Sequence, residues 1–276
     1  MKPGRILNRL LLVLFAAGLV VSSIRLICDG IDSAAQKADY DALAAQVALS
    51  RREARSTGAD VYDRVPIDAP PDPTETVLLP EYEAVYAQNP DTVGWLEIGG
   101  TCINYPVMQT PDHADFYLKR SFDGAYSAHG CLYVRESCDV FAPSDNVTIY
   151  GHHMNDGSMF AALDNYRSQS FWQEHPTIRF DTLYAHHTYT VFAVFTTTAT
   201  PGEGFAFHLF EDAENEADFD AFVTQCKERS LIDTGITPLY GDKLICLSTC
   251  EYTQSNGRLV VAALRDNETA DRDTLP

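Results

Sequence analysis

The chain has 276 residues, 45% of them hydrophobic, so it is long enough to bury a sizeable core in one or two domains. Its formal net charge of -19 excludes nucleic-acid binding through neutralised phosphates as a main function. Residues 1–28 contain four of the 20 basic residues and no acidic residue, which leaves all 39 acidic residues to the remainder. A basic tip on an acidic body predicts a membrane-inserted end and a soluble remainder.

The N-terminal tip contains an apolar stretch, residues 10–24, between Arg9 and Arg25. Because both arginines can extend their charged ends to the membrane surface, we expect a spanning helix over residues 6–28. At ~1.5 Å per residue it is about 34 Å long, enough to cross a hydrocarbon core of ~30 Å. The basic residues before it predict a cytoplasmic N-terminus and an extracellular remainder. The alternative is a cleaved signal peptide, but no clear A-x-A cleavage site follows.

Three segments follow the predicted anchor. Residues 32–54 are Ala-rich with apolar residues at helical spacing, which predicts a helix leaving the membrane. Five prolines between residues 66 and 80 predict an extended linker, and a short helix is expected over residues 81–88. We therefore expect a tip and anchor (1–28), a juxtamembrane helix and linker (29–80), the main folded domain (81–268) and a C-terminal tail (269–276).

From Gly94 onward the sequence is typical of strands, because Val, Ile, Tyr, Phe and Thr dominate short runs separated by turn residues. One acidic segment, residues 211–230, has helical spacing instead. Eight strands with one late helix favour a closed β-barrel, a mainly β fold with added helices, over a βαβ sheet. The runs are residues 94–98, 103–109, 130–134, 146–151, 177–183, 189–199, 243–250 and 258–265.

The six cysteines beyond the predicted anchor form neither a disulfide framework nor a metal site. No CxxC or H-x3-H spacing occurs, so we expect no metal and no cofactor. Most of these cysteines are expected to be small buried hydrophobic residues. They are Cys102, Cys131, Cys138, Cys226, Cys246 and Cys250.

One candidate for chemistry is His152, in the stretch "NVTIYGHHMNDGSMF". A strand pattern runs into Gly151 and ends there, so His152 is expected at an exposed rim that a substrate can reach. From this stretch alone, a surface histidine near a turn remains the alternative.

A second candidate is Cys250, which closes the strand pattern "KLICLSTC". Alternation places Cys246, Ser248 and Cys250 on one face, with Cys250 last in the row. A cysteine attacks as thiolate, and a free pKa of ~8.5 leaves little thiolate near neutrality, so it needs a nearby imidazole or cation. A hairpin would put Arg258 beside Cys250, where its guanidinium can stabilise a developing oxyanion. The alternative is a buried structural cysteine and a surface arginine.

The stretch "SAHGCLYVR", residues 127–135, resembles the S-H-G-C-x-R signature of L,D-transpeptidases. It departs from that signature because Arg135 follows Cys131 by four residues rather than two, and no upstream His-Gly pair is found. Cys131 is therefore the weaker candidate for a nucleophile.

Taken together, "NPDTVGWLEI", "INYPVMQ", "NVTIYGHHMNDGSMFAAL" and "LSTCEYTQSNGRLVV" resemble the class B sortases of Gram-positive bacteria. The resemblance covers roughly residues 89–266 and includes the order His, Cys, Arg, whereas papain-like proteases have the cysteine first. In this family the residue after the catalytic histidine is often asparagine, and here it is His153.

The resemblance implies an eight-stranded sortase-like β-barrel, N-terminal helices and a helix before the cysteine strand. It implies a membrane-anchored, extracellular cysteine transpeptidase with Cys250 as nucleophile, His152 as general acid and base, and Arg258 with a backbone N–H near Glu251 at the oxyanion. Ser248, Thr249 and Glu251 are expected to contact substrate.

The implied substrates are secreted proteins with a C-terminal sorting motif, NPxTN- or LPxTG-like, cleaved after Thr. The implied acceptor is an amine of a cell-wall precursor or peptidoglycan. The alternatives are an L,D-transpeptidase-like or hydrolytic cysteine peptidase, and a catalytically silent surface binding domain.

Overall fold

The computed structural model describes residues 3–56, 77–253 and 255–266. Most of the predicted linker and all of the predicted C-terminal tail lie outside these residues. The chain divides into two compact units, Met1–Ala42 and Leu43–Pro276.

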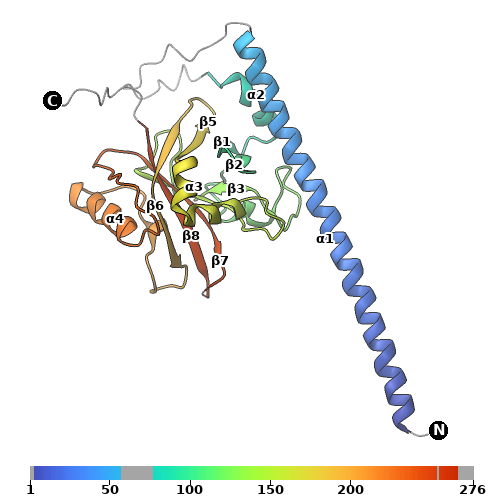
Figure 1. Cartoon of the computed structure of the whole chain (residues 1–276). Coiled ribbons are helices and arrows are strands. Elements are labelled where there is room, and N and C mark those ends of the chain that lie inside the picture. Colours follow the sequence, from blue (N-terminus) through green and yellow to red (C-terminus); the bar gives the residue numbers. More distant parts are fainter. Residues whose placement is uncertain (1–2, 57–76, 254, 267–276) are drawn as a thin grey trace, which may run out of the picture. The chain divides into compact units, whose positions relative to one another are not determined.

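The N-terminal helix α1 (Pro3–Ser56) is a single helix of 54 residues, so the two helices expected over residues 6–28 and 32–54 are continuous (Figure 1). It is uninterrupted because its one proline stands at its first residue, where the ring does not clash with a preceding turn. The described part contains an 18-residue window of mean hydropathy 1.8, apolar and long enough to cross a membrane.

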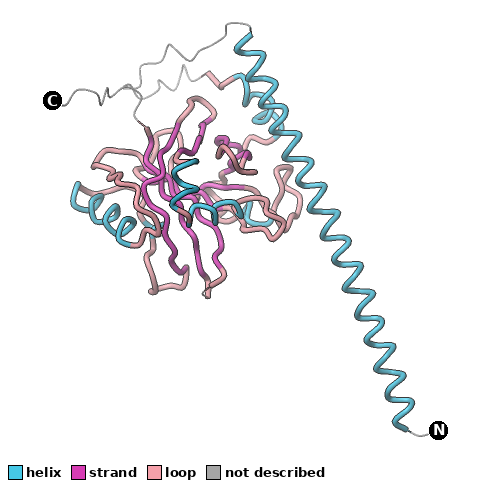
Figure 2. The backbone as a smooth tube through the Cα atoms, viewed as in Figure 1, coloured by secondary structure: helices cyan, strands magenta, loops and turns pink. Residues whose placement is uncertain are grey.

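Eight strands form the closed barrel that the sequence predicted, in the order β1-β2-β3-β4-β7-β8-β6-β5 (Figures 1 and 2). Each predicted run overlaps one of them. Their bounds are β1 (Thr92–Glu97), β2 (Asn104–Met108), β3 (Leu132–Val134), β4 (Asn146–Tyr150), β5 (Thr177–Thr182), β6 (Thr188–Thr198), β7 (Leu244–Glu251) and β8 (Gly257–Arg265).

Short helices decorate the barrel. The expected helix after the linker is α2 (Pro80–Gln88), and the expected late helix is α4 (Glu216–Glu228). This α4 begins later than residue 211 because the side chain of Asn215 accepts a hydrogen bond from the N–H of Asp218 and caps it there. Sequence patterns did not indicate α3 (Gln169–Glu174) or the 3-10 helices η2 (Phe116–Lys119), η3 (Ala161–Arg167) and η4 (Phe207–Leu209).

The helix α4 packs one apolar face against the barrel. Phe219, Phe222 and Cys226 of that face join a buried cluster with Cys246 of β7 and Val260 of β8. Residues that alternate with a period of two share a face of a strand, so Ser248 and Cys250 continue the row of Cys246 beyond the cover of α4.

A buried charged cluster joins the C-terminal part of α1 to β5. The carboxylate of Asp181 is fully buried and accepts from Arg51 Nη2 (3.1 Å), Arg179 Nη2 (2.7 Å) and His186 Nδ1 (2.8 Å), and from the Tyr82 hydroxyl (2.5 Å). Burial alone raises the pKa of Asp181, but its hydrogen bonds to His186 and Arg179 outweigh burial and lower the pKa to about 2. The ionised carboxylate therefore stabilises the fold.

This cluster predicts a particular loss of stability in acid. Because the folded pKa of Asp181 lies below the ordinary 3.8, its contribution is present above about pH 4 and is lost as the pH falls towards 2. A shift of this size corresponds to roughly 2 kcal/mol. Urea unfolding of the wild type and Asp181→Asn between pH 2 and 5 should show a shallower slope of unfolding free energy against pH in the variant. Equal slopes would contradict the assignment.

Candidate active site

The end of the barrel where β4 and β7 finish brings together two of the predicted catalytic residues. These strands are parallel and in register, with Tyr150 opposite Ser248 at the last pair. The backbone N–H of Gly151 then donates to the carbonyl of Ser248 at 3.1 Å. His152 and Cys250 each follow that last pair by two residues. They therefore lie at the same level along the two adjacent strands.

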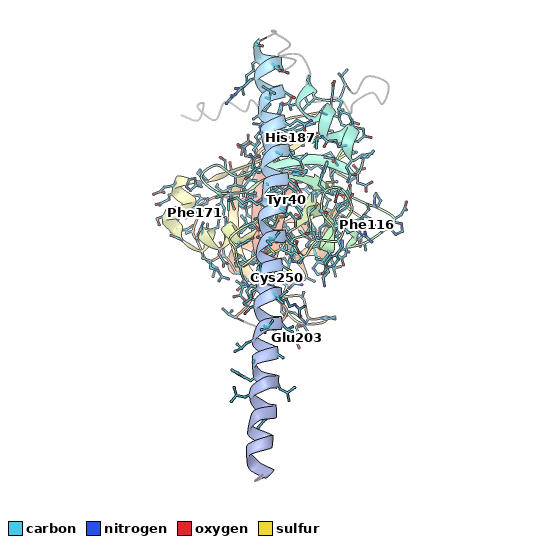
Figure 3. The ribbon with its side chains drawn as sticks, turned by 90° about the vertical axis from the view of Figure 1, so that its right-hand side faces the viewer. Tyr40, Phe116, Phe171, His187, Glu203 and Cys250 are labelled. Carbon is cyan, nitrogen blue, oxygen red and sulfur yellow. The ribbon has the colours of Figure 1, made fainter. Side chains whose placement is uncertain are left out.

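The third predicted residue, Arg258, is the direct antiparallel partner of Cys250 in the pairing of β7 with β8. Directly opposite side chains share one face of a sheet, with Cβ atoms ~4.5–5.5 Å apart. The Nη1 of Arg258 donates to the carbonyls of Gly257 (2.9 Å) and Asn256 (3.3 Å). Figure 3 shows Cys250 on the side of the barrel towards Glu203 and away from His187. The guanidinium thus lies at the same barrel end as the thiol.

The ring of His152 is oriented by a backbone carbonyl. Its Nε2 lies 2.6 Å from the carbonyl oxygen of Leu118 in η2. A carbonyl oxygen can only accept, so Nε2 carries the hydrogen and, in the neutral ring, Nδ1 is the nitrogen that can take a proton. The tautomer suits a general base that acts through Nδ1.

The carbonyl of Leu118 is held in place by the "SAHGC" segment. The N–H of Cys131 donates to the carbonyl of Tyr117 at 3.1 Å. Gly130 has a φ of +60°, and a Cβ at this position would lie 2.5 Å from the Leu118 oxygen. Only glycine combines this backbone conformation with so close an approach. The segment that resembles another transpeptidase signature therefore supports the histidine.

Cys250 differs from four of the other cysteines in its exposure to solvent. Cys250 is partly exposed, whereas Cys131, Cys138, Cys226 and Cys246 are buried. Burial raises the pKa of Cys138 to about 11 and also raises the pKa values of Cys226 and Cys246 above the ordinary value of a thiol. Cys131 is only 1% exposed, so its thiol is inaccessible to a substrate, which argues against Cys131 as a nucleophile. All cysteines in the described part of the chain are free thiols, and Cys28 and Cys102 are exposed.

The three residues expected to contact substrate are all buried. Ser248 lies on the face of Cys250, and Thr249 on the opposite face, and both hydroxyl oxygens lack a hydrogen-bond partner among the described residues. The carboxylate of Glu251 is engaged by the N–H and hydroxyl of Thr253, at 3.0 and 2.9 Å. Of the three side chains, only that of Ser248 lies on the face of the thiol.

Several residues around the site carried no recognisable signal in the sequence. Arg167 of η3 contacts both Asp164 (3.2 Å) and Glu251 (3.3 Å), and Asp164 contacts His153 (2.9 Å). The contact between Arg167 and Glu251 joins segments 84 residues apart in the chain, so no local spacing indicated it. The exposed Tyr252 donates its hydroxyl to the carbonyl of His153 at 3.1 Å.

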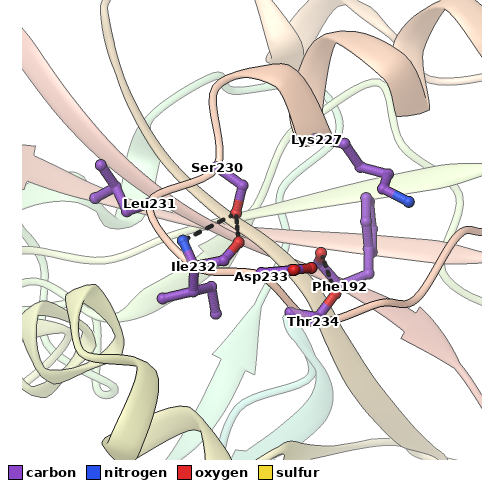
Figure 4. Close-up of a pocket in the computed structure, with 7 residues that line it drawn as sticks. All are labelled: Phe192, Lys227, Ser230, Leu231, Ile232, Asp233 and Thr234. Atoms are coloured by element: carbon purple, nitrogen blue, oxygen red, sulfur yellow. Dashed lines mark hydrogen bonds between the residues drawn. The ribbon is translucent and has the colours of Figure 1, made fainter.

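Two further kinds of site in the described part of the chain would be a metal site and a hollow elsewhere on the barrel. Within the described residues, no group of three or more His, Cys, Asp or Glu side chains could hold a metal ion. A hollow of about 400 Å³ beside the C-terminal end of α4 is lined by none of the predicted site residues (Figure 4). Its hydroxyls are satisfied locally, since Ser230 donates to the carbonyl of Ile232 and Thr234 to that of Phe192, each at 2.8 Å. The hollow is therefore separate from the predicted site.

Comparisons with known proteins identify the family to which this fold belongs. A family model described as the sortase domain matches residues 96–266. Sortase B of Staphylococcus aureus is 32% identical over 188 residues, which cover 67% of this chain and 75% of that protein. The structure of a S. aureus sortase B–substrate complex is 26% identical, covers 87% of this chain and all of that chain, and has a TM-score of 0.72. A sortase B complexed with triglycine is also 26% identical, covers 86% of this chain and all of that chain, and has a TM-score of 0.71. These matches confirm the predicted resemblance to class B sortases.

The exposure pattern predicts which thiols react in the folded protein. Among the cysteines beyond residue 28, iodoacetamide should modify Cys250 and Cys102, whereas the four buried cysteines should react only after denaturation. Peptide mapping by mass spectrometry checks this, with the urea-unfolded chain as the control. Modification of Cys131 as fast as Cys250 would contradict the assignment.

Proposed function

The chain belongs to the sortase family of cysteine transpeptidases, and we propose that Cys250 is its nucleophile, His152 its general acid and base, and Arg258 its oxyanion-stabilising cation. The main support is the strand register. The parallel pairing of β4 with β7 and the antiparallel pairing of β7 with β8 bring imidazole, thiol and guanidinium to one barrel end.

The proposed reaction has two acyl transfers. The sulfur of Cys250 attacks the carbonyl carbon of the substrate threonine, and the negative charge that develops on the oxygen is stabilised by Arg258 and a backbone N–H near Glu251. As the peptide bond breaks, His152 donates to the leaving amine the proton that it took from the thiol of Cys250 before the attack. His152 then removes a proton from the incoming amine, which attacks the thioester and releases the thiol.

The proposed donor substrate is a secreted protein with a C-terminal sorting motif of the NPxTN or LPxTG type. The proposed acceptor is an amine of a cell-wall precursor or peptidoglycan. The triglycine complex of a sortase B supports a terminal amine as acceptor. We propose that Ser248, which shares the face of Cys250, contacts the donor peptide, and that Thr249 and Glu251, on the opposite face of β7, shape the same region indirectly. All three side chains are buried in the structure.

We propose that the N-terminal helix anchors the enzyme in the cell membrane as a single span. Residues 1–28 would form the cytoplasmic tip and anchor, residues 29–80 the juxtamembrane helix and linker, residues 81–268 the extracellular catalytic domain and residues 269–276 a tail. The apolar window of α1 and the basic residues before it support this orientation.

Peptide turnover by the full chain in detergent tests the proposed roles. An NPxTN-like and an LPxTG-like fluorogenic peptide are each offered with and without triglycine. Cys250→Ala should abolish turnover, His152→Ala should lower kcat by about 10²- to 10⁴-fold, and Arg258→Ala by about 10²- to 10³-fold. Cys131→Ala is the control for the nucleophile. His153→Ala removes the neighbour of the proposed base rather than the base itself, so it should lower kcat less than His152→Ala.

The outcomes separate the alternatives. A product in which the cleaved peptide is joined to triglycine, seen by mass spectrometry, supports transpeptidation. Equal cleavage with and without triglycine, and no joined product, supports a hydrolase. An active Cys250→Ala would refute Cys250 as nucleophile, and loss of activity in Cys131→Ala alone would favour Cys131.

A second prediction concerns the support of the histidine. Gly130→Ala should push the Leu118 carbonyl away from His152 and lower kcat by about 10- to 100-fold, since displacement by ~1 Å can cost this much. Ala128→Gly, a change two residues earlier, is the matched control and should leave kcat within about twofold. Steady-state kinetics with circular dichroism checks both, and unchanged kcat in folded Gly130→Ala would contradict the proposed support.

A further inference from the structure

The backbone ladder between β4 and β7 stops before it reaches the catalytic residues. Its last pair is Tyr150 with Ser248, followed by the hydrogen bond from Gly151 to the Ser248 carbonyl. His152 and Cys250 therefore lie beyond the pairing of β4 with β7, although Cys250 is still paired with Arg258 of β8. Something other than this ladder must hold the two segments at a constant separation.

A chain of side-chain contacts crosses this gap. His153 Nε2 lies 2.9 Å from Asp164 Oδ2, and Asp164 Oδ1 lies 3.2 Å from Arg167 Nε. The Nη2 of the same arginine lies 3.3 Å from Oε1 of Glu251. The two ends of the chain, His153 and Glu251, are the residues that directly follow the proposed base and the proposed nucleophile.

The ends of this chain are well fixed. The side chain of Glu251 is 3% exposed and is also bound by the N–H and hydroxyl of Thr253. The ring of His153 packs edge-on against Tyr252, with ring centroids 5.5 Å apart, and its carbonyl accepts from the hydroxyl of Tyr252. Glu251 is therefore a fixed end. The side chains of Arg167 and Asp164, 36% and 44% exposed, connect it to the ring of His153, which is adjacent to His152.

The helix η3 that supplies the two middle residues is itself rigid. The carbonyl of His152 accepts from the N–H of Phe160, the residue before η3, at 2.9 Å. Within η3, Leu163 and Tyr166 are fully buried, and the Tyr166 hydroxyl donates to the carbonyl of His175 at 2.9 Å. The helix is thus a fixed support on which Asp164 and Arg167 stand.

We propose that Asp164 and Arg167 are positioning residues that bridge the backbone after His152 to the backbone after Cys250 and so set the distance between imidazole and thiol. This inference rests on the proposed function. Neither residue touches the reacting atoms in this account. Their contribution is to hold the base and the nucleophile in register where the strands no longer do.

The opposite end of the same two strands offers a matched control. Asp145 precedes β4 and Lys243 precedes β7, and their side chains form an ion pair at 2.8 Å. Lys243→Met therefore breaks an ion pair between the same two strands, at the end remote from the site. A general effect on strand stability should follow from either substitution, whereas an effect on catalytic geometry should follow only from the bridge.

The test measures kcat and KM for peptide turnover by the full chain in detergent, together with melting temperature. Arg167→Met and Asp164→Asn should each lower kcat by about 10- to 100-fold with KM within about twofold, because misplacement affects the chemical step rather than binding. The double variant should be no slower than the slower single variant, since both changes break one bridge. Arg167→Lys should regain part of the lost kcat, and Lys243→Met should keep the wild-type kcat.

The contrary results are distinct from one another. Wild-type kcat in both folded variants, additive losses in the double variant, or an equal loss in Lys243→Met would overturn the bridge while Cys250-dependent turnover of the wild type persists. Absence of any Cys250-dependent turnover in the wild type would instead overturn the proposed function and the bridge with it. If Arg167→Met fails to fold, Asp164→Asn and Arg167→Lys decide by the same measures.

Discussion

The parallel pairing of β4 with β7 is the constraint on which the site depends. Its register, Tyr150 opposite Ser248, fixes the position of His152 relative to Cys250, since each follows that pair by two residues. A slip of one residue in this pairing would offset His152 from Cys250 along the two strands. The pairing of β7 with β8 places Arg258 beside Cys250 directly, because the two residues are partners in that antiparallel ladder.

Beyond the pairing of β4 with β7, contacts from loops and short helices position the residues of the site. The carbonyl of Leu118 fixes the tautomer of His152, and the glycine of "SAHGC" permits that carbonyl to approach. On the other side of His152, η3 provides the contacts that reach Glu251. The pairing of β4 with β7 ends at Gly151 and Ser248. Beyond it, polar contacts from segments outside β4 and β7 connect the residues that follow His152 and Cys250.

The sequence predicted the barrel well because its strands are short, rich in β-branched and aromatic residues and separated by turn residues. The order of His152, Cys250 and Arg258 could be read because each ends or opens a strand. The bridge through Asp164 and Arg167 could not be predicted, since η3 has no apolar periodicity and Arg167 meets Glu251 across 84 positions of sequence. The cluster around Asp181 could not be predicted from the sequence for the same reason, because Arg51 and Asp181 are 130 positions apart. Local patterns report elements, whereas contacts between distant polar side chains depend on the completed fold.

The central claim is that the acyl group of the donor peptide is carried on the sulfur of Cys250. Intact-mass spectrometry of the full chain, quenched in acid during turnover of a sorting peptide without an acceptor amine, tests this most directly. The account predicts an adduct with the mass of the acyl portion, located on the peptide that contains Cys250 and lost on addition of triglycine. An adduct on any other cysteine, or turnover with no adduct and no dependence on Cys250, would contradict it.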